Sequence, residues 1–255
     1  MLLCVDIGNT NIVLGVFQDE KLSHSFRIQS DLMQTADEYG TKIMNICSFY
    51  ELDFHMINGV IISSVVPGLD NTFEKMVETY FKTKAMFVGP GTKSGIKIKI
   101  DNPKQLGADI LVGAVATYHK YGSPAIIVDM GTAITFAYLN QEKELLGGVI
   151  VPGIKTAFSS LVSKTSKLEE VRMDAPLKII GKDTVSSIQS GMIYGTSSMI
   201  DGMIRKIKKE MNLEKVITVL TGGEARLIKP YLEETVIYDD NLLLDGLKLI
   251  YLKNQ

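Results

Sequence analysis

The chain of 255 residues has few of the residues that build metal clusters and disulfide frameworks. It contains only two cysteines, Cys4 and Cys47, and three scattered histidines, and none of these forms a C-x-x-C or a paired-histidine spacing. Such spacings are the usual signature of a zinc site, and dense cysteine patterns mark small secreted domains. The sequence therefore predicts two reduced, structural cysteines and no zinc site.

Long apolar runs and a stripe of basic residues are missing as well. No apolar stretch approaches the roughly 20 residues that a membrane-spanning helix needs, and Asp6 interrupts the first apolar run too early for a signal peptide. The 27 basic and 29 acidic residues give a net charge of -2, and the basic residues form no stripe. We therefore expect a cytoplasmic protein with no nucleic-acid partner and no membrane partner.

The amino-terminal stretch carries the first strong motif. The apolar run Leu2–Val5 ends at Asp6, and the polar residues Gly8–Thr10 separate it from a second apolar run, Ile12–Val16. This pattern predicts a β-hairpin with a polar turn. The glycine lets the backbone approach a ligand, and a carboxylate with hydroxyl and amide groups suits a phosphate and its metal ion.

The same pattern recurs near the middle of the chain. The apolar run Ala125–Val128 leads to Asp129, the residues Gly131–Thr132 form the turn, and Phe136–Leu139 forms the return strand. A single Asp-Gly turn is often only a hairpin connection. Two copies favour an α/β protein with two similar domains, residues 1–118 and 119–255, and a nucleotide-binding cleft between them.

A third turn joins a predicted strand to a predicted helix late in the chain. The β-branched run Val216–Leu220 is followed by Thr221, Gly222 and Gly223, and helical spacing continues to about Leu232. Glycines without a Cβ allow a base or a ribose to lie against the backbone. A Gly-Gly pair at such a turn is equally compatible with a simple tight connection.

The helix predicted over Ala108–Tyr121 places Asp109 in its first turn. A carboxylate is favoured at this position by the unpaired N–H groups and by the helix dipole. Capping alone therefore explains Asp109, and a catalytic role is the alternative.

These motifs occur in the order Asp6-x-Gly-Asn-Thr, Gly107-Ala-Asp109, Asp129-x-Gly-Thr, Gly147-Gly-x-Ile-x-Pro-Gly153 and Thr221-Gly-Gly223. Together they resemble the type III pantothenate kinase family, within the acetate and sugar kinase, Hsp70 and actin superfamily. The resemblance implies two ribonuclease-H-like (actin-like ATPase) domains with ATP in the cleft. It also implies phosphorylation of pantothenate to 4'-phosphopantothenate, the first step of coenzyme A synthesis, by a homodimer that uses Mg²⁺ and a monovalent cation, K⁺ or NH₄⁺.

The resemblance also implies roles for individual residues. Asp109 would be the general base, Asp129 would bind potassium, and Asp6 would lie near magnesium. The expected ATP-binding residues, with the glycine turn included, are Asp6, Ile7, Gly8, Asn9, Thr10, Asn11, Ile12, Val13, Thr132, Gly222 and Gly223. The expected pantothenate-binding residues are Ile100, Gly107, Ala108, Asp109, Ile110 and Thr184.

Two of these positions depart from the family pattern, because Ile100 and Ile110 stand where a tyrosine and an arginine are usual. Isoleucine donates no hydrogen bond, and a charge-assisted hydrogen bond contributes about 1.5–3 kcal/mol. This departure leaves a non-catalytic paralogue, acting as a regulatory binding protein, as the alternative function. Retention of the carboxylates of Asp6, Asp109 and Asp129 favours the kinase. A sugar or acetate kinase would share the ATP turns but not the helix start at Asp109.

Overall fold

The structure is a computed structural model that describes residues 1–164 and 171–255. The chain forms two compact units, and the first combines Met1–Lys120 with Asn241–Gln255. The second unit is Tyr121–Asp240. The predicted second domain extends to residue 255, whereas the last 15 residues, Asn241–Gln255, lie with the first unit.

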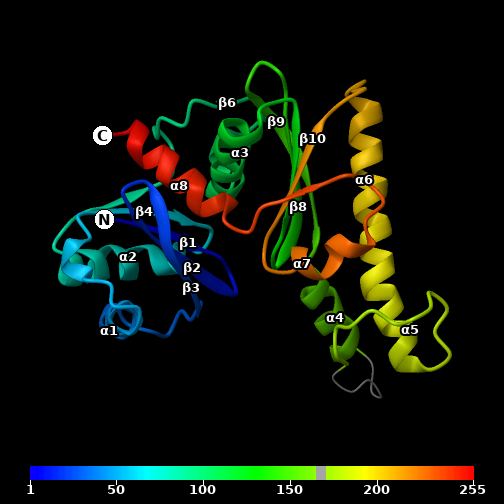
Figure 1. Ribbon diagram of the computed structural model, residues 1–255, viewed down its shortest axis with the longest axis horizontal. Helices are drawn as coiled ribbons and strands as arrows, with labels where there is room; N and C mark the ends of the chain where they lie inside the picture. Colours follow the sequence, from blue (N-terminus) through cyan, green and yellow to red (C-terminus); the bar gives the residue numbers. More distant parts are fainter. Residues whose placement is uncertain (165–170) are drawn as a thin grey trace. The chain divides into compact units, whose positions relative to one another are not determined.

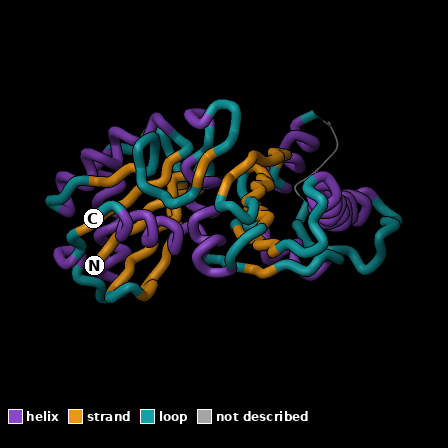
Figure 2. Tube along the Cα trace, turned by 90° about the horizontal axis from the view of Figure 1, so that it is seen from above, coloured by secondary structure: helices purple, strands orange, loops and turns teal. Residues whose placement is uncertain are grey.

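The first unit contains a mixed sheet with the strand order β3-β2-β1-β4-β5 and helices on both of its faces (Figures 1 and 2). The strands of this sheet are β1 (Leu2–Ile7), β2 (Asn11–Gln18), β3 (Lys21–Gln29), β4 (Gly59–Ser64) and β5 (Ala85–Phe87). The unit also contains the short strand β6 (Lys97–Ile98), which is not part of this sheet. Its α-helices are α1 (Ala36–Phe49), α2 (Pro67–Met76), α3 (Ala108–Tyr121), which ends at the boundary of the unit, and α8 (Leu242–Lys253). Single helical turns cover Phe54–Met56, Val77–Phe81 and Pro103–Gln105.

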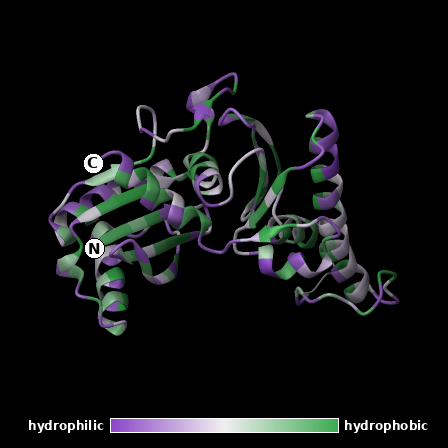
Figure 3. Cartoon of the chain, turned by 45° about the horizontal axis from the view of Figure 1, so that its top comes forward, coloured by the Kyte–Doolittle hydropathy of each residue, from purple (hydrophilic) through white to green (hydrophobic). Residues whose placement is uncertain are grey.

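One face of this sheet packs against α1 and α2. Alternate side chains of a strand point to opposite faces, and Leu3, Val5 and Ile7 of β1 share a buried cluster with residues of both helices, among them Phe73. Figure 3 shows the strands of this unit as mainly hydrophobic. Burial on this scale, at about 25 cal/mol per Å² of apolar surface, is the main source of stability for the unit.

The other face of the same strands packs against α8. A Cβ at Gly59 would lie 2.1 Å from the hydroxyl oxygen of Tyr251, and a Cβ at Gly15 would lie 2.8 Å from a methyl carbon of Leu244. The side chains of Leu242, Leu244, Leu247 and Ile250 are buried. Glycines in β2 and β4 thus let the last helix lie close to the sheet, which explains why it joins the first unit.

The second unit repeats the arrangement of the first. Its strands lie in the order β11-β10-β7-β8-β9, which matches β5-β4-β1-β2-β3. The strands are β7 (Ala125–Met130), β8 (Ala133–Leu139), β9 (Glu144–Pro152), β10 (Ile217–Thr221) and β11 (Ile237–Tyr238). The helices are α4 (Ile154–Ser163), α5 (Thr184–Ser190), α6 (Thr196–Glu210) and α7 (Ala225–Ile228), with single turns over Gly191–Gly195 and Lys229–Tyr231.

The two motif aspartates occupy equivalent places in the two sheets. β1 pairs with β2 antiparallel and with β4 parallel, and in this register Asp6 lies opposite Ser63. β7 pairs with β8 antiparallel and with β10 parallel, and Asp129 lies opposite Thr221. The prediction of two similar α/β halves, each beginning with a hairpin, is confirmed.

Candidate functional site

The turn between β1 and β2 is held by a residue outside the motif. The N–H of Gly8 donates to the carbonyl of Asn11 at 3.1 Å, which closes the turn. The hydroxyl of Ser30 donates to the carbonyl of Gly8 at 2.5 Å, and the N–H of Ser30 donates to the carbonyl of Thr10 at 3.0 Å. Ser30 therefore fixes both ends of the turn, and the motif spacing contains no signal for it.

Burial divides the predicted ATP loop, residues 6–13, into two groups. Ile7 and Ile12 are fully buried in the cluster with α1 and α2, so a ligand could meet only their backbone. The side chains of Asn9, Thr10 and Asn11 are exposed, and Asp6, Gly8 and Val13 are partly buried. The exposed part of the loop therefore carries one hydroxyl and two amides, which are hydrogen-bond donors for phosphate oxygens.

The turn after Asp129 is held in a similar way by the start of α4. The N–H of Gly153 donates to the carbonyl of Thr132 at 2.9 Å, and the hydroxyl of Thr156 donates to the same carbonyl at 2.7 Å. The side chain of Thr132 remains exposed. The Pro-Gly motif at the end of β9 thus serves to fix the turn that carries Thr132.

Two glycines allow other segments to pack against this turn. A Cβ at Gly153 would lie 2.1 Å from the carbonyl oxygen of Gly131, and a Cβ at Gly222 would lie 2.4 Å from Oδ1 of Asp129. Gly222 also has φ of +96°, a conformation that a residue with a side chain rarely adopts. The second unit therefore brings together three predicted site residues, Asp129, Thr132 and Gly222, and Gly223 follows directly.

An ion pair joins the glycine turn to α4. The ammonium of Lys155 lies 2.7 Å from a carboxylate oxygen of Glu224, whose side chain is mostly buried, and the N–H of Glu224 donates to the carbonyl of Met130 at 3.1 Å. Neither contact follows from the residue spacing, because Lys155 and Glu224 are far apart in the sequence. Together they tie the Thr221-Gly222-Gly223 turn to the Asp129 turn.

Asp109 lies in the first turn of α3 and is partly buried. Its Oδ1 accepts the N–H of Ile110 at 2.8 Å. Burial raises the pKa of Asp109, and the hydrogen bond from Ile110 offsets only part of this effect. The unpaired N–H groups at a helix start favour the charged carboxylate and would lower its pKa. In Asp109 desolvation has the larger effect, so the pKa is raised.

Gly107 leaves the space that the Asp109 carboxylate occupies. A Cβ at position 107 would lie 2.3 Å from Oδ1 of Asp109. Ala108 and Ile110 are partly buried on the same turn, and Ile100 is partly buried in the segment between β6 and this helix. The residues 107–110 thus form one short segment of the first unit with the carboxylate at its centre.

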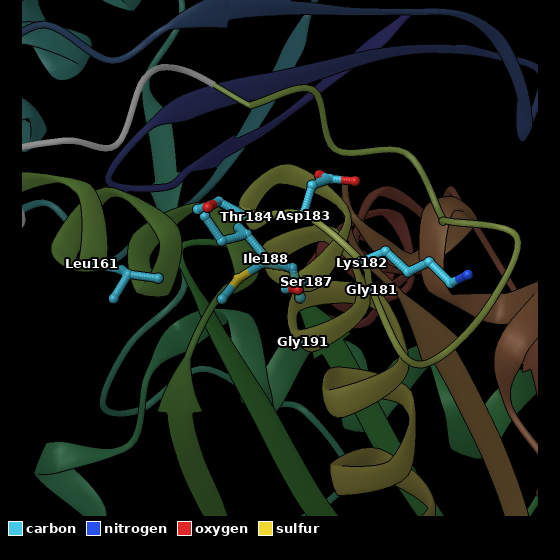
Figure 4. A pocket seen from close by; sticks show the side chains of 9 residues that line it. Leu161, Gly181, Lys182, Asp183, Thr184, Ser187, Ile188 and Gly191 are labelled. Atoms are coloured by element: carbon cyan, nitrogen blue, oxygen red, sulfur yellow. The ribbon is translucent and has the colours of Figure 1, made fainter.

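Thr184 belongs to the second unit and begins α5. Asp183 precedes it as the N-cap, with the N–H of Ser186 donating to its Oδ1 at 2.8 Å. Thr184 lines an open hollow of about 600 Å³ together with Leu161, Ser187, Ile188 and Met192 (Figure 4). The side chain of Lys182 extends away from Leu161 in this view. The hollow therefore presents mixed apolar and hydroxyl groups to a ligand.

The donors at the two aspartate turns fit metal ions that are bound with a nucleotide. Within residues 1–164 and 171–255, no group of three or more His, Cys, Asp or Glu side chains could hold a metal ion. Mg²⁺ that enters with a nucleotide needs only one or two carboxylates, because phosphate oxygens and water supply the other ligands. The single carboxylate of Asp6 is enough for such an Mg²⁺ ion, whereas the described residues do not supply the three or four protein ligands of a zinc site.

Comparison with known proteins identifies the family. The profile of type III pantothenate kinase matches residues 2–206. A type III pantothenate kinase from Syntrophus aciditrophicus (strain SB) is 44% identical over 254 residues, covering 100% of both chains.

Solved structures with low sequence identity share the fold. A proposed 2-dehydro-3-deoxygalactonokinase from Sinorhizobium meliloti has a TM-score of 0.62 at 11% identity and covers 98% of this chain and 96% of its own. A proposed Baf family transcriptional activator from Campylobacter jejuni has a TM-score of 0.60 at 20% identity, and the match covers 99% of this chain and 98% of that protein's chain. These likenesses agree with the two-domain, ribonuclease-H-like fold of actin-like kinases. With the profile match and the full-length relative, the chain belongs to the type III pantothenate kinase family.

Proposed function

We propose that this protein transfers the γ-phosphoryl group of ATP to pantothenate, giving 4'-phosphopantothenate and ADP, the first step of coenzyme A synthesis. Family membership and the full-length relative support this activity. The observation that carries it is the repeated Asp-x-Gly turn, which has the same strand register in both units and exposes hydrogen-bond donors in each.

ATP is bound in this proposal by the turns of both units. The first turn, Asp6–Val13, offers backbone N–H groups and the exposed side chains of Asn9, Thr10 and Asn11 to phosphate oxygens. Thr132 offers its exposed hydroxyl to the γ-phosphate. In this proposal Gly222 and Gly223 contact the nucleoside through their backbone. A side chain at 222 would also collide with Asp129. Fixation of these turns by Ser30 and Gly153 supports the role, because preorganised donors cost least to bring to a charged group.

Asp109 acts as the general base in the proposed reaction. Its carboxylate receives the proton of the pantothenate hydroxyl as the hydroxyl oxygen bonds to the γ-phosphorus and the bond to ADP breaks. The transition state is loose, so the residue must mainly hold the hydroxyl in line and take the proton late. A pKa raised by burial makes the carboxylate a better proton acceptor.

The pantothenate contacts in this proposal come from residues 100–110 of the first unit and from Thr184 of the second. Gly107, Ala108 and Ile110 flank the base, and Ile100 and Thr184 complete the set. Ile100 and Ile110 offer only apolar contact, so hydrogen bonds to pantothenate must come from backbone groups, Asp109 and the exposed hydroxyl of Thr184.

The proposed cations are Mg²⁺ at Asp6 and K⁺ or NH₄⁺ at Asp129. When bound, they would supply positive charge beside the phosphate oxygens. We further propose a homodimer in the cytoplasm. Among the described residues, no helix is both long enough and apolar enough to span a membrane.

A coupled assay of ADP release tests the proposed function. The purified protein is given ATP, Mg²⁺ and K⁺, with and without pantothenate. We expect ADP release that depends on pantothenate and that falls when K⁺ is replaced by Na⁺. Absence of pantothenate-dependent ADP with every cation tested would instead favour the regulatory binding protein that Ile100 and Ile110 leave open.

A further inference from the structure

The hydroxyl of Ser63 is buried without a partner. Ser63 in β4 is fully buried, and its Oγ has no hydrogen-bond partner within the described parts of the chain. A buried hydroxyl without a partner destabilises a fold, and such groups are rare. The next residue shows the contrast, because Oγ of Ser64 donates to Oδ1 of Asp70 at 2.6 Å and accepts the N–H of Val66 at 3.2 Å. Ser64 has a structural role, whereas the fold gives Ser63 none.

The position of Ser63 places this hydroxyl beside Asp6. The two residues are partners in the parallel pairing of β4 with β1, and paired strands lie about 4.8 Å apart. Val5 and Ile62 belong to the cluster that faces α1 and α2. Because side chains alternate along a strand, Asp6 and Ser63 both point to the opposite face.

The second unit repeats this pairing of a carboxylate with a buried hydroxyl residue. Thr221 is the partner of Asp129 in the parallel pairing of β10 with β7, and it is 2% exposed. Each turn carboxylate therefore has a hydroxyl residue beside it on the neighbouring parallel strand. The repetition concerns the position of the hydroxyl only, because Thr221 is not among the buried hydroxyl residues that lack a hydrogen-bond partner.

We propose that the Ser63 hydroxyl binds a water molecule in the hydration shell of the divalent cation that accompanies the nucleotide at Asp6. The inference rests on the proposed function and adds a residue to its nucleotide site. Mg²⁺ keeps several of its waters when it binds to proteins, and a bridging water is nearly as favourable as a direct hydrogen bond. A hydroxyl suits such a water because it donates and accepts. The partner that Ser63 lacks arrives with the metal ion.

Calorimetry of nucleotide binding tests this proposal without turnover. The affinity for the non-hydrolysable analogue AMP-PNP is measured with Mg²⁺ and with EDTA for the wild type, Ser63→Ala and Thr117→Val. We expect Ser63→Ala to lose about five- to tenfold in affinity with Mg²⁺ and nothing with EDTA. Thr117 carries the other fully buried hydroxyl without a partner among the described residues, on α3, so Thr117→Val is the matched control and should bind as the wild type does.

The melting temperature without ligand gives the second readout. Ser63→Ala should melt at or above the wild type, because it removes an unpaired polar group, and Ser63→Thr should restore the effect of Mg²⁺. The inference would be overturned if Mg²⁺ raised the AMP-PNP affinity of Ser63→Ala as much as that of the wild type, or if the variant lost the same affinity with EDTA. A melting temperature of Ser63→Ala below that of the wild type would also overturn it. A wild type whose affinity does not rise with Mg²⁺ would count against the metal site of the proposed function itself.

Discussion

At the scale of single residues, the proposed reaction depends on the environment of the Asp109 carboxylate. Its carboxylate is partly buried at the start of α3 and accepts a hydrogen bond from the N–H of Ile110. Burial raises its pKa above the usual value of 3.8, so the charged form costs stability in the folded state. A raised carboxyl pKa means that this cost is fully present above the folded pKa and absent below the unfolded pKa.

The variant Asp109→Asn should therefore separate stability from turnover. At pH 7 we expect a higher melting temperature than that of the wild type, because the buried charge is gone and the amide oxygen still accepts the N–H of Ile110. The difference should narrow as the pH falls through the raised pKa of Asp109 towards 3.8. Melting curves at several pH values measure this, and a gain that does not vary with pH would contradict the burial argument.

The same variant should lose about 100-fold or more in kcat, since a positioned base contributes about 10²–10⁴-fold. Its Kd for ATP should stay within about twofold of the wild type, because no ATP-binding role is assigned to Asp109. Steady-state kinetics and calorimetry check the two values. Normal turnover would remove Asp109 from the mechanism.

At the scale of elements, the turns depend on segments that are distant in sequence. Ser30 follows β3, yet it holds both ends of the β1–β2 turn. Ser30→Ala removes the hydroxyl contact to Gly8 and keeps the backbone one. We expect a loss of about 0.5–1.5 kcal/mol in the free energy of unfolding and a several-fold higher Kd for ATP. Denaturant unfolding and calorimetry measure both effects. Unchanged ATP binding would show that the loop does not need the hydrogen bond from Ser30 to Gly8.

The glycines of the second unit give a matched set of variants. Gly153→Ala would place a Cβ 2.1 Å from the carbonyl oxygen of Gly131, which cannot move without breaking the turn. Gly131→Ala is the control, because the nearest atom to its Cβ would lie at an ordinary 3.8 Å. We expect Gly153→Ala to lose about 1–3 kcal/mol or more in unfolding free energy and Gly131→Ala to lose well under that. Equal losses in the two variants would contradict the close approach.

The sequence predicts local elements well and distant contacts poorly. The helix expected over Ala108–Tyr121 matches α3, because apolar spacing defines it. The helix expected to continue to Leu232 ends as α7 at Ile228 and gives way to a single turn that contains Pro230, since proline lacks the N–H that an α-helix needs. The support from Ser30 and the ion pair of Lys155 with Glu224 could not be predicted, because no local pattern encodes them.

At the scale of the whole molecule, the chain returns to its first unit at the end. The local spacing of apolar residues in α8 is compatible with a helix, but it does not determine which sheet the helix covers. The information lies in Gly15 and Gly59, whose missing side chains admit Leu244 and Tyr251. Because α8 packs on the first unit, the second unit ends at Asp240, whereas the predicted second domain extends to residue 255.

Removal of α8 should therefore damage the first unit. A chain that ends at Asp240 would expose the strand face that now meets Leu242, Leu244, Leu247 and Ile250, all buried. Each such side chain contributes about 2–5 kcal/mol, so the four together contribute an amount comparable to the total of about 5–15 kcal/mol expected for a native protein. We expect loss of cooperative melting in the first unit, measured by calorimetry and hydrogen exchange. Protection of β1 that persists without α8 would contradict this packing.

The central claim is that two equivalent aspartate turns serve one phosphoryl donor while Asp109 activates the acceptor alcohol. Its most direct test is transfer of radiolabel from γ-³²P-ATP to pantothenate, with the product identified by mass spectrometry. The account predicts labelled 4'-phosphopantothenate from the wild type and almost none from Asp109→Asn. Label released only as inorganic phosphate, or equal labelling of pantothenate by both proteins, would contradict it.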